Sequence, residues 1–342
     1  MKNRKTLRKI AVSIMCIVLV FAAMTMAAAA DGAYQPDASV AVFATDRHDN
    51  ALIIGEIMAA VKEDGHAPGL FCLGGDMVGG GPDIEANTNY APEVDSAFVQ
   101  AEVHGALSRD VRVAILQASH DRNMTDSAGI LVGEPKGFAS GEFNVFIVPE
   151  TYMADSAEAQ KAAEVFEAWA GSNEVDANKP IIVLSHMPMH ALRNDNLGGY
   201  VWHQALNSVA AGENGEIIRN VIFFHGHNHT ADGEEYYHPV GTSLAIQGAA
   251  DEEEYEEVIN YTYITAGYLD QNGDATLLRV EEEQIVVDKY SADGGENLGT
   301  IARLKPVSES NVLIYVGAAV LALLVVGAAV ILARRKSAQK QA

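Results

Sequence analysis

Aspartate and histidine side chains recur in this sequence directly after short apolar segments. They occur as Asp46 and His48 in ATDRHD, Asp76 in LGGDMV, His120 and Asp121 in QASHDRN, His186 in VLSHMP, and His227 and His229 in FHGHNH. Carboxylate and imidazole groups together bind divalent metals of intermediate softness such as Zn, Mn and Fe. Donors of both kinds are numerous enough here for two ions that share one bridging aspartate.

Such a pair of ions indicates chemistry at phosphorus. Two divalent ions about 3.5–4 Å apart can hold the attacking and leaving oxygens of an in-line displacement, and they generate hydroxide near neutral pH. Each motif alone also has an ordinary structural explanation, such as a helix N-cap for Asp46, a turn at Asp76, a core histidine for His186 and a surface pair for His227 and His229. Their occurrence together, in order and each after an apolar segment, favours the metal site.

The elements that must position these side chains are short buried strands that alternate with amphipathic helices. Buried strands are predicted by the apolar runs at 39–44, 70–73, 111–116, 144–148, 181–184 and 221–224. Apolar residues at helical spacing occur in the segments 50–63, 93–107 and 156–171. The alternation predicts an α/β fold with a partly parallel sheet, in which ligand-binding residues gather beyond the carboxyl ends of the strands.

Beyond residue 241 the helical pattern fades. Consecutive strands are expected at 243–247, 261–269, 275–280 and 284–289, and the Asn272-Gly273 pair predicts a hairpin between the second and third of them. A sheet of this kind can pack face to face against the sheet of the βα units, with helices outside. The folded domain is expected to cover residues 31–292, and residues 293–311 are expected to form a tether.

Both ends of the chain have the composition of membrane-targeting segments. Residues 1–30 place Lys and Arg before an apolar run and an Ala-rich stretch, the layout of a cleaved secretory signal; an uncleaved signal anchor is the alternative. Residues 312–333 are uncharged and apolar, which predicts a transmembrane helix. The basic residues that open the tail 334–342 predict a cytoplasmic C-terminus and an extracellular N-terminal domain.

The net charge of −23, from 46 acidic and 23 basic residues, argues against a nucleic-acid partner, because an acidic surface repels phosphate backbones. The acidic run 251–257 is expected to be a solvated loop, with a Ca²⁺ site as the alternative. Cys72 is the one cysteine between the terminal segments, so no disulfide is expected in the domain. The loop 79–82 is expected to border the site, but it lacks the Lys and Ser/Thr of a P-loop.

Taken in order, the motifs DxH, GD, GNH[DE], a lone His and GHxH make the sequence resemble the calcineurin-like metallophosphoesterases over residues 40–229. The resemblance implies a four-layer α/β sandwich, in which two mixed β-sheets pack face to face with flanking helices. It implies one ion bound by Asp46, His48, Asp76 and His229, and a second bound by Asp76, His186 and His227. Asp76 would then bridge the two ions.

The resemblance also implies roles for the residues of the third motif. His120 would lie over the phosphate, where it stabilises developing charge or protonates the leaving oxygen, and Asp121 would hold its imidazole in the working tautomer. Ser119 stands where the family has an Asn ligand of the second ion, so that water or Asn123 could complete the ligand set. Arg47 is a second departure, which could bind a substrate phosphate or form an ion pair away from the site.

These observations predict extracellular hydrolysis of a small phosphate mono- or diester, with two divalent ions (Mn, Zn or Fe) as cofactors and a membrane anchor at the C-terminus. The alternative is a catalytically weak or inactive surface domain for binding or sensing, which Ser119 favours. Processing of peptidoglycan or teichoic acid is a third possibility, suggested only by the predicted location. A purple acid phosphatase is not favoured, because Gly79 stands where that subclass has Tyr; a two-domain 5′-nucleotidase would need more residues before the apolar segment.

Overall fold

The computed structural model describes residues 34–48, 52–77, 95–121, 124–190, 196–212, 214–227, 229, 237–250, 253–269, 273–282 and 284–305. The chain divides into two compact units, Met1–Pro36 and Asp37–Ala342, and only residues 34–36 of the first are described. The predicted signal segment, the apolar segment 312–333 and the loop 79–82 lie outside the described residues. Within the described ranges, no helix combines the length and apolar character needed to cross a membrane.

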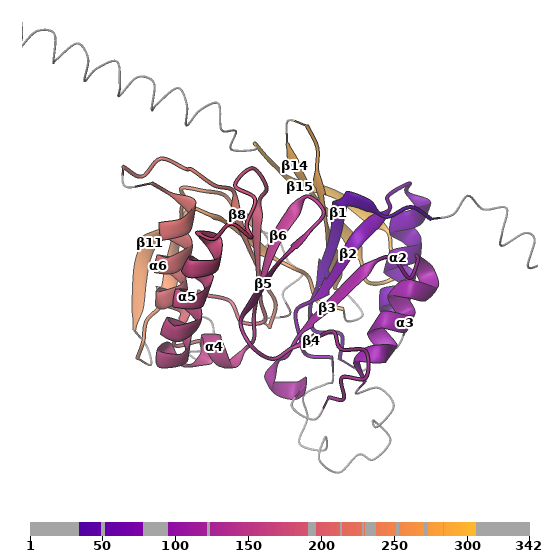
Figure 1. The fold of residues 1–342 in the computed structure, drawn as a ribbon, viewed down its shortest axis with the longest axis horizontal. Helices are drawn as coiled ribbons and strands as arrows, with labels where there is room; N and C mark the ends of the chain where they lie inside the picture. Colours follow the sequence, from indigo (N-terminus) through magenta and orange to yellow (C-terminus); the bar gives the residue numbers. More distant parts are fainter. Residues whose placement is uncertain are drawn as a thin grey trace, which may run out of the picture. The chain divides into compact units, whose positions relative to one another are not determined.

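Two large mixed sheets form the centre of the second unit (Figure 1). The seven-stranded sheet consists, in spatial order, of β15 (Asn297–Leu304), β14 (Ile285–Ser291), β13 (Asp274–Val280), β1 (Asp37–Ala44), β2 (Pro68–Leu73), β3 (Arg112–Leu116) and β4 (Leu131–Val132). The six-stranded sheet consists of β5 (Lys136–Ser140), β6 (Phe143–Val148), β7 (Ile181–Ser185), β8 (Val221–His225), β12 (Thr262–Thr265) and β9 (Tyr237–His238). A separate pair joins β10 (Ser243–Gln247) to β11 (Glu254–Val258).

Helices cover the outer faces of the two sheets, as Figure 1 shows. The seven-stranded sheet carries α2 (Ile53–Glu63) and α3 (Ser96–Ala106), and the six-stranded sheet carries α4 (Thr151–Ala154), α5 (Ser156–Ala170) and α6 (Gly199–Ala210). The order helix, sheet, sheet, helix is the four-layer α/β arrangement expected from the sequence. Strands β1, β2 and β3 run parallel to one another, as do β6, β7 and β8.

The central strands β6, β7 and β8 of the six-stranded sheet are largely apolar and are buried on both faces. In β8, Ile222 and Phe224 belong to the apolar cluster between the two sheets. Val221 and Phe223 of the same strand belong to the cluster beneath the helices, which also contains Trp202. Side chains alternate between the faces of a strand, so a strand with two buried faces appears in the sequence as a continuous apolar run.

Two of the helices begin at aspartate caps. The side chain of Asp155 accepts hydrogen bonds from the backbone N–H groups of Ala157 and Glu158, at 2.9 and 3.0 Å, at the start of α5. The side chain of Asp95 accepts one from Ala97, at 3.0 Å, at the start of α3. These contacts satisfy N–H groups that have no partner inside the helix, which stabilises each helix end by about 1 kcal/mol.

The expected βα units are confirmed, but several later elements differ from the sequence-based predictions. The prediction of a hairpin at Asn272-Gly273 is wrong, because β12 and β13 lie in different sheets and do not pair with each other. Residues 297–304, expected to belong to a tether, instead form β15 at the edge of the seven-stranded sheet. Part of the acidic run expected to be a loop forms β11, whose side chains are mostly exposed. Helix α6, which contributes Trp202 to the core, had no counterpart among the predicted elements.

Candidate metal centre

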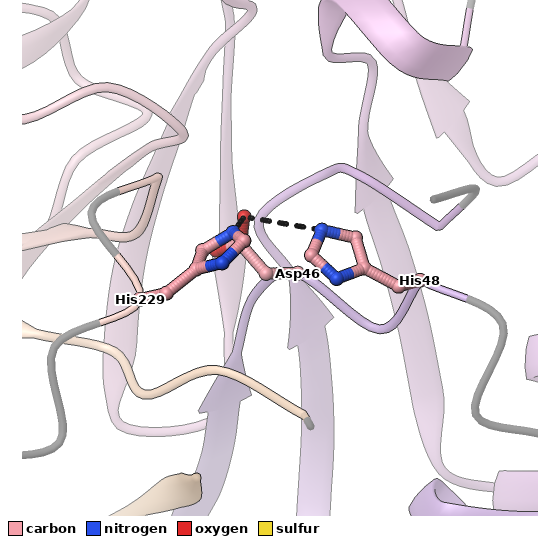
Figure 2. A group of neighbouring side chains, drawn as sticks. All are labelled: Asp46, His48 and His229. Carbon is pink, nitrogen blue, oxygen red and sulfur yellow. Dashed lines mark hydrogen bonds and ion pairs between the residues drawn. The ribbon is translucent and has the colours of Figure 1, made fainter. Parts of the chain in front are cut away.

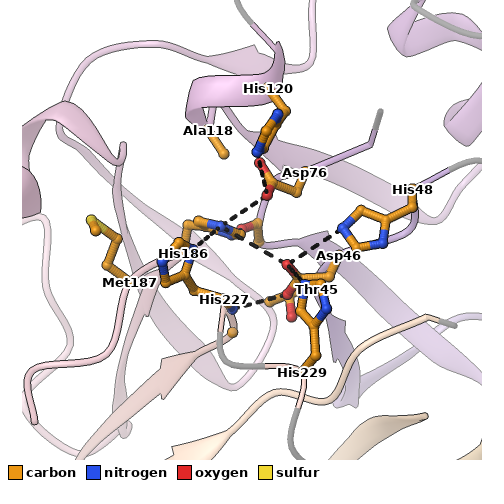
Figure 3. Close-up of polar contacts among 12 residues, drawn as sticks. Thr45, Asp46, His48, Asp76, Ala118, His120, His186, Met187, His227 and His229 are labelled. Atoms are coloured by element: carbon orange, nitrogen blue, oxygen red, sulfur yellow. Dashed lines mark hydrogen bonds and ion pairs between the residues drawn. The ribbon is translucent and has the colours of Figure 1, made fainter. Parts of the chain in front are cut away.

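The predicted ligands lie where strands of both sheets end, and the structure brings them together (Figure 3). Asp46 and His48 follow β1 and Asp76 follows β2 in the seven-stranded sheet. His186 follows β7, and His227 and His229 follow β8, in the six-stranded sheet. The cluster therefore lies at the carboxyl ends of parallel strands, as expected for a ligand site in an α/β fold. It also joins the two sheets, because each contributes ligands.

The backbone at these positions is held in an uncommon conformation. Positive φ angles occur at Asp46 (51°), His48 (48°), Asp76 (51°), His227 (71°) and His229 (50°), and Leu52 is the one other non-glycine residue of the described ranges with a positive φ. A left-handed conformation at a non-glycine residue costs about 1–3 kcal/mol and is concentrated at functional sites. Two backbone hydrogen bonds hold the turns: Asp46 N–H to Gly75 O, at 3.0 Å, and His48 N–H to Asp76 O, at 2.9 Å.

Glycines of the motifs allow the loops to approach one another closely. At Gly226, an added Cβ would lie 2.1 Å from Thr45 Oγ1 and 2.5 Å from Asp46 Oδ2. Gly75 combines a φ of +92° with a Cβ position 2.6 Å from the Cβ of Ala118. Side chains at either position would push the metal-ligand loops apart, which explains the glycine next to a ligand in both the GD and GHxH motifs.

The first group of candidate ligands is Asp46, His48 and His229, whose donor atoms lie within 4.8 Å of one another. Figure 2 shows the two imidazoles beside the carboxylate of Asp46. Asp46 Oδ1 lies 3.0 Å from His229 Nε2 and 4.0 Å from His48 Nε2. Asp46 Oδ2 accepts a hydrogen bond from the backbone N–H of His227 at 3.0 Å, which fixes the carboxylate and leaves Oδ1 toward the imidazoles.

The second group is Asp76, His186 and His227, whose donor atoms also lie within 4.8 Å of one another. His186 Nδ1 lies 3.0 Å from the carbonyl oxygen of Gly74, and because a carbonyl only accepts, this nitrogen must carry a hydrogen. In the neutral ring the lone pair is then on Nε2, which lies 3.2 Å from Asp76 Oδ2 and 3.1 Å from His227 Nδ1. His186 is therefore oriented as a ligand by a backbone contact behind it.

The electrostatics of the cluster favour a cation. Asp76 Oδ1 is buried and has no hydrogen-bond partner among the described residues. Burial lowers the pKa of His186, but the charges of Asp46 and Asp76 outweigh burial and raise this pKa to about 10. Burial would raise the pKa of Asp46, but His186 and a hydrogen bond with His229 outweigh it and hold this pKa below its usual range. Buried carboxylates that require a positive partner fit divalent ions held by both groups.

The two groups are close enough to act as one centre. Asp46 Oδ1 of the first group lies 3.9 Å from His186 Nε2 of the second. His120 stands at the edge of this cluster, with Nε2 3.8 Å from Asp76 Oδ2 and a side chain that is 39% exposed. Figure 3 shows its ring on the far side of Asp76 from His186. His120 can thus reach a molecule that enters from solvent.

Asp121 contacts different groups from those implied by the resemblance. Its carboxylate is buried and accepts hydrogen bonds from the backbone N–H groups of Asp76 (3.0 Å), Met77 (2.9 Å) and Ala118 (3.1 Å). Burial and the charge of Asp76 raise its pKa to about 6. Asp121 therefore fixes the turn that carries Asp76 and ties it to the turn that carries His120. Ser119 lies in that short 3₁₀ turn, Ser119–Asp121, but its side chain and Asn123 are outside the described part.

Comparisons with known proteins give similarity in fold only. No family model and no curated protein matches the sequence. A purple acid phosphatase from yellow lupin matches with a TM-score of 0.46 and 11% identity. The match covers 80% of this chain and 55% of that protein. GAP50 of Plasmodium, described as the anchor in its inner membrane complex, matches with a TM-score of 0.46 and 10% identity over 78% of this chain and 88% of that protein.

The phosphoesterase YfcE from E. coli matches with a TM-score of 0.34 and 12% identity, over 77% of this chain and 98% of that protein. Because the identities and TM-scores are low, the function is inferred from the side chains of the site.

Arg47, between the two ligands of the first motif, neither faces solvent nor lies free to bind a phosphate. Its side chain is 3% exposed and pairs with Glu102 of α3, with 2.7 Å between NH2 and Oε1. Arg47 Nε and NH1 and Glu102 Oε2 are buried without hydrogen-bond partners among the described residues. The ion pair anchors the metal-ligand turn to α3. Glu102 was not predicted from the sequence, because it lies 55 positions away on a helix without any motif.

Breaking this ion pair from one side is expected to destabilise the protein. Arg47→Met leaves the carboxylate of Glu102 buried and unpaired, so we expect the free energy of unfolding to fall by about 3 kcal/mol. The double variant Arg47→Met/Glu102→Leu removes both charges and should recover most of that loss. Urea unfolding of metal-free protein measures both values. A double variant as unstable as Arg47→Met would show that the packing of the guanidinium, and not its charge, supports the turn.

Two further histidines, His190 and His225, lie close to the ligands in the sequence and pack against Tyr263. His190 Nδ1 lies 2.7 Å from the hydroxyl of Tyr263, and the ring of His225 stacks on Tyr263 at 4.5 Å between centroids. Burial, aided by the charge of His238, lowers the pKa of His190 to about 4. Burial also lowers the pKa of His225. Both are neutral, packed side chains that support the loops after β7 and β8.

Proposed function

We propose that this chain is a metal-dependent phosphoesterase that hydrolyses a small phosphate mono- or diester with two divalent ions, Mn, Zn or Fe. The proposal rests on two donor groups of three residues each, one that contains Asp46 and one that contains Asp76. The two groups lie close together at the ends of strands from two sheets. Mixed carboxylate and imidazole donors suit these metals. When bound, such ions supply Lewis acidity toward phosphoryl oxygens and a nucleophile near neutral pH.

We assign the donor residues to the two ions as follows. Asp46, His48 and His229 would hold one ion, and His186 and His227 would hold the other. Asp76 would be a ligand shared by the two ions, because Oδ2 lies 3.2 Å from His186 Nε2 and Oδ1 is buried with no hydrogen-bond partner among the described residues. Fixed donors in a buried site are already oriented before the reaction, whereas water molecules would have to reorient. Such donors therefore stabilise the charge that develops at phosphorus in the transition state.

His120 is assigned to the phosphate and the leaving oxygen. It lies at the edge of the cluster, is partly exposed and belongs to neither donor group, so it can contact an ester bound at the ions without being a ligand itself. A positioned imidazole donates a proton to a leaving oxygen or stabilises charge, which contributes about 10²–10⁴-fold in rate. Asp121 acts as a positioning residue, because it fixes the backbone of Asp76 and Ala118.

Space for the substrate's alcohol lies beside the turn that carries His120. A cavity of about 510 Å³ opens there, lined by Gln117, Ala118, Glu150 and Thr151 among others. Its volume lies within the range of small-molecule sites. The lining includes two acidic residues, Glu150 and Asp155, which favours an uncharged or cationic alcohol over a second phosphate.

The same proposal locates the domain outside the cell, with the C-terminal segment 312–333 as a single-pass anchor. Its support is the sequence: an apolar, uncharged stretch long enough to span a bilayer, followed by Arg334, Arg335 and Lys336. Protease added to intact cells should then degrade the domain while leaving a short membrane-bound fragment. Protection of the domain until the cells are lysed would contradict this location.

The activity is tested with mono- and bis-p-nitrophenyl phosphate. The purified chain is freed of metal with EDTA and assayed with Mn²⁺, Zn²⁺ or Fe²⁺ added back. We expect turnover that appears only with metal, and the preferred ester decides between monoesterase and diesterase. If one ion binds per chain and no metal restores turnover, the alternative of an inactive binding domain, with a second site lost at Ser119, is favoured instead.

A further inference from the structure

A second cavity lies at the other end of β3, away from the metal centre. It has a volume of about 540 Å³ and is bounded by α3, β3, β4 and β5, which Figure 1 shows side by side. We call it the edge cavity, because β4 and β5 are edge strands of the two sheets. Its volume is within the range of sites that hold a small molecule.

The edge cavity gathers positive charge in an acidic protein. Arg109, Arg112 and Lys136 line it, whereas Glu134 is the one acidic residue in its lining. The sequence has 46 acidic residues against 23 basic ones, so basic side chains should readily find carboxylates. Five other described bases do so, namely Arg47, Lys161, Lys179, Arg279 and Lys289, whereas Arg219, Arg303 and Lys305 form no ion pair with another described residue. Within the described ranges, no ion pair involves the three bases of the edge cavity.

One of these cations is held in a fixed position. The guanidinium carbon of Arg112 lies 3.7 Å from the centroid of the Phe138 ring, and NH1 donates a hydrogen bond to the carbonyl oxygen of Ala139 at 2.9 Å. Stacking on an aromatic face and a backbone contact restrict the side chain in advance. The remaining N–H groups keep the planar arrangement that binds carboxylate or phosphate through two parallel hydrogen bonds.

Part of the lining is apolar, beside the polar side chains of Gln100 and His104. Val113 and Ala114 of β3 are buried, and Ile130, Leu131 and Phe138 are partly exposed in the wall. An apolar wall beside a fixed guanidinium matches a molecule with an anionic head and an apolar body, because burial of the body contributes about 25 cal/mol per Å². A small inorganic anion would leave this wall in contact with water.

We propose that the edge cavity binds a single amphiphilic anion, with a carboxylate or phosphate head at Arg112 and Lys136 and an apolar body against Ile130, Leu131 and Phe138. Gly133 lines both the edge cavity and the cavity beside His120, but the anionic head would bind apart from the metal centre. Arg112 begins β3 and the turn with His120 follows the end of that strand, so at about 3.3 Å per residue the strand alone separates them by about 13 Å. The proposal therefore goes beyond phosphoester hydrolysis and does not depend on it.

The test is calorimetric titration of the full chain, in EDTA, with decylphosphonate below its micelle concentration. This probe has the head and the body but no ester to hydrolyse. We expect one molecule bound per chain, with methylphosphonate and decanol each at least about tenfold weaker because each lacks one half of the interaction. Decanol binding as tightly as decylphosphonate would overturn the proposal, as would binding only to vesicles of anionic lipid.

Variants locate the binding site and separate it from the metal centre. Arg112→Gln and Lys136→Gln should each weaken decylphosphonate binding about tenfold. Lys161→Gln, which removes the same charge from an exposed surface lysine, should leave it unchanged. Lys136 is exposed, so its replacement tests the proposal even if Arg112→Gln unfolds the protein. Equal weakening by Lys136→Gln and Lys161→Gln would show that only net charge matters and would reject the site. Turnover of p-nitrophenyl phosphate should be unaffected by Lys136→Gln.

Discussion

Asp76→Asn is expected to lower metal-dependent turnover by roughly 10³-fold, equivalent to about 4 kcal/mol of barrier. The substitution keeps the size of the side chain but removes the charge that the proposed bridge supplies to both ions. Asp76 is 3% exposed, and Oδ1 has no hydrogen-bond partner among the described residues that would preserve its position. Neutralising it should also reduce the number of bound ions, because His186 and His227 alone are a weak ligand set. Turnover and metal content per chain, by elemental analysis, measure both effects.

Asp110→Asn, at an exposed position outside both donor groups, is the matched control and should change neither quantity. The assignment of Asp76 as a shared ligand would be wrong if Asp76→Asn kept both ions and lost only activity. That result would make Asp76 a contact to the substrate or to an attacking water. A variant that kept full activity would remove the two-ion proposal altogether.

His120→Ala is expected to lower turnover by about 10²–10⁴-fold while leaving metal content unchanged. The reason is its position: the imidazole stands at the rim, 3.8 Å from Asp76, and belongs to neither donor group. If His120 protonates the leaving oxygen, the loss should be larger for phenyl phosphate, a poor leaving group, than for p-nitrophenyl phosphate. Comparison of turnover with the two esters measures this difference.

Equal losses with both esters would mean that His120 stabilises charge on the phosphoryl group and does not supply the proton. His66→Ala, which replaces a histidine outside both donor groups, serves as the control and should retain turnover. Loss of bound metal in His120→Ala would contradict its assignment as a residue that acts on substrate only.

The first half of the fold could be predicted from the sequence because its signals are local. Strands with two buried faces, such as β6 and β7, appear as continuous apolar runs, and α5 shows helical spacing after its Asp155 cap. The later elements have weaker signals. The acidic residues of β11 resemble a loop, since its partner β10 supplies the apolar side chains of the pair. The hairpin at Asn272 was wrong because turn residues do not specify which strands pair.

The candidate ligands were predictable for a similar reason. Each follows an apolar run, and the ends of parallel strands meet at one edge of a sheet, so Asp46 and Asp76 of one sheet could be grouped without a structure, as could His186 and His227 of the other. Their partners were not predictable. Arg47 and Glu102 are far apart in sequence, and whether an arginine between two ligands faces solvent depends on how α3 packs beside β1 and β2. The contacts of Asp121 with three backbone N–H groups likewise depend on the relative position of two turns.

The sequence by itself determined the donor types, their order, and the strands and helices that carry them, because these depend on residues close together along the chain. Only the tertiary structure brought the donors of the two sheets together, since Asp46 and Asp76 follow strands of one sheet, whereas His186 and His229 follow strands of the other. It also decided which charges are buried and paired, as at Arg47. It likewise decided which basic side chains lie together and form no ion pair within the described residues, as at Arg112 in the edge cavity. The burial and pairing of charges depend on which distant segments of the chain pack against each other, and the spacing of residues along the sequence does not specify that packing.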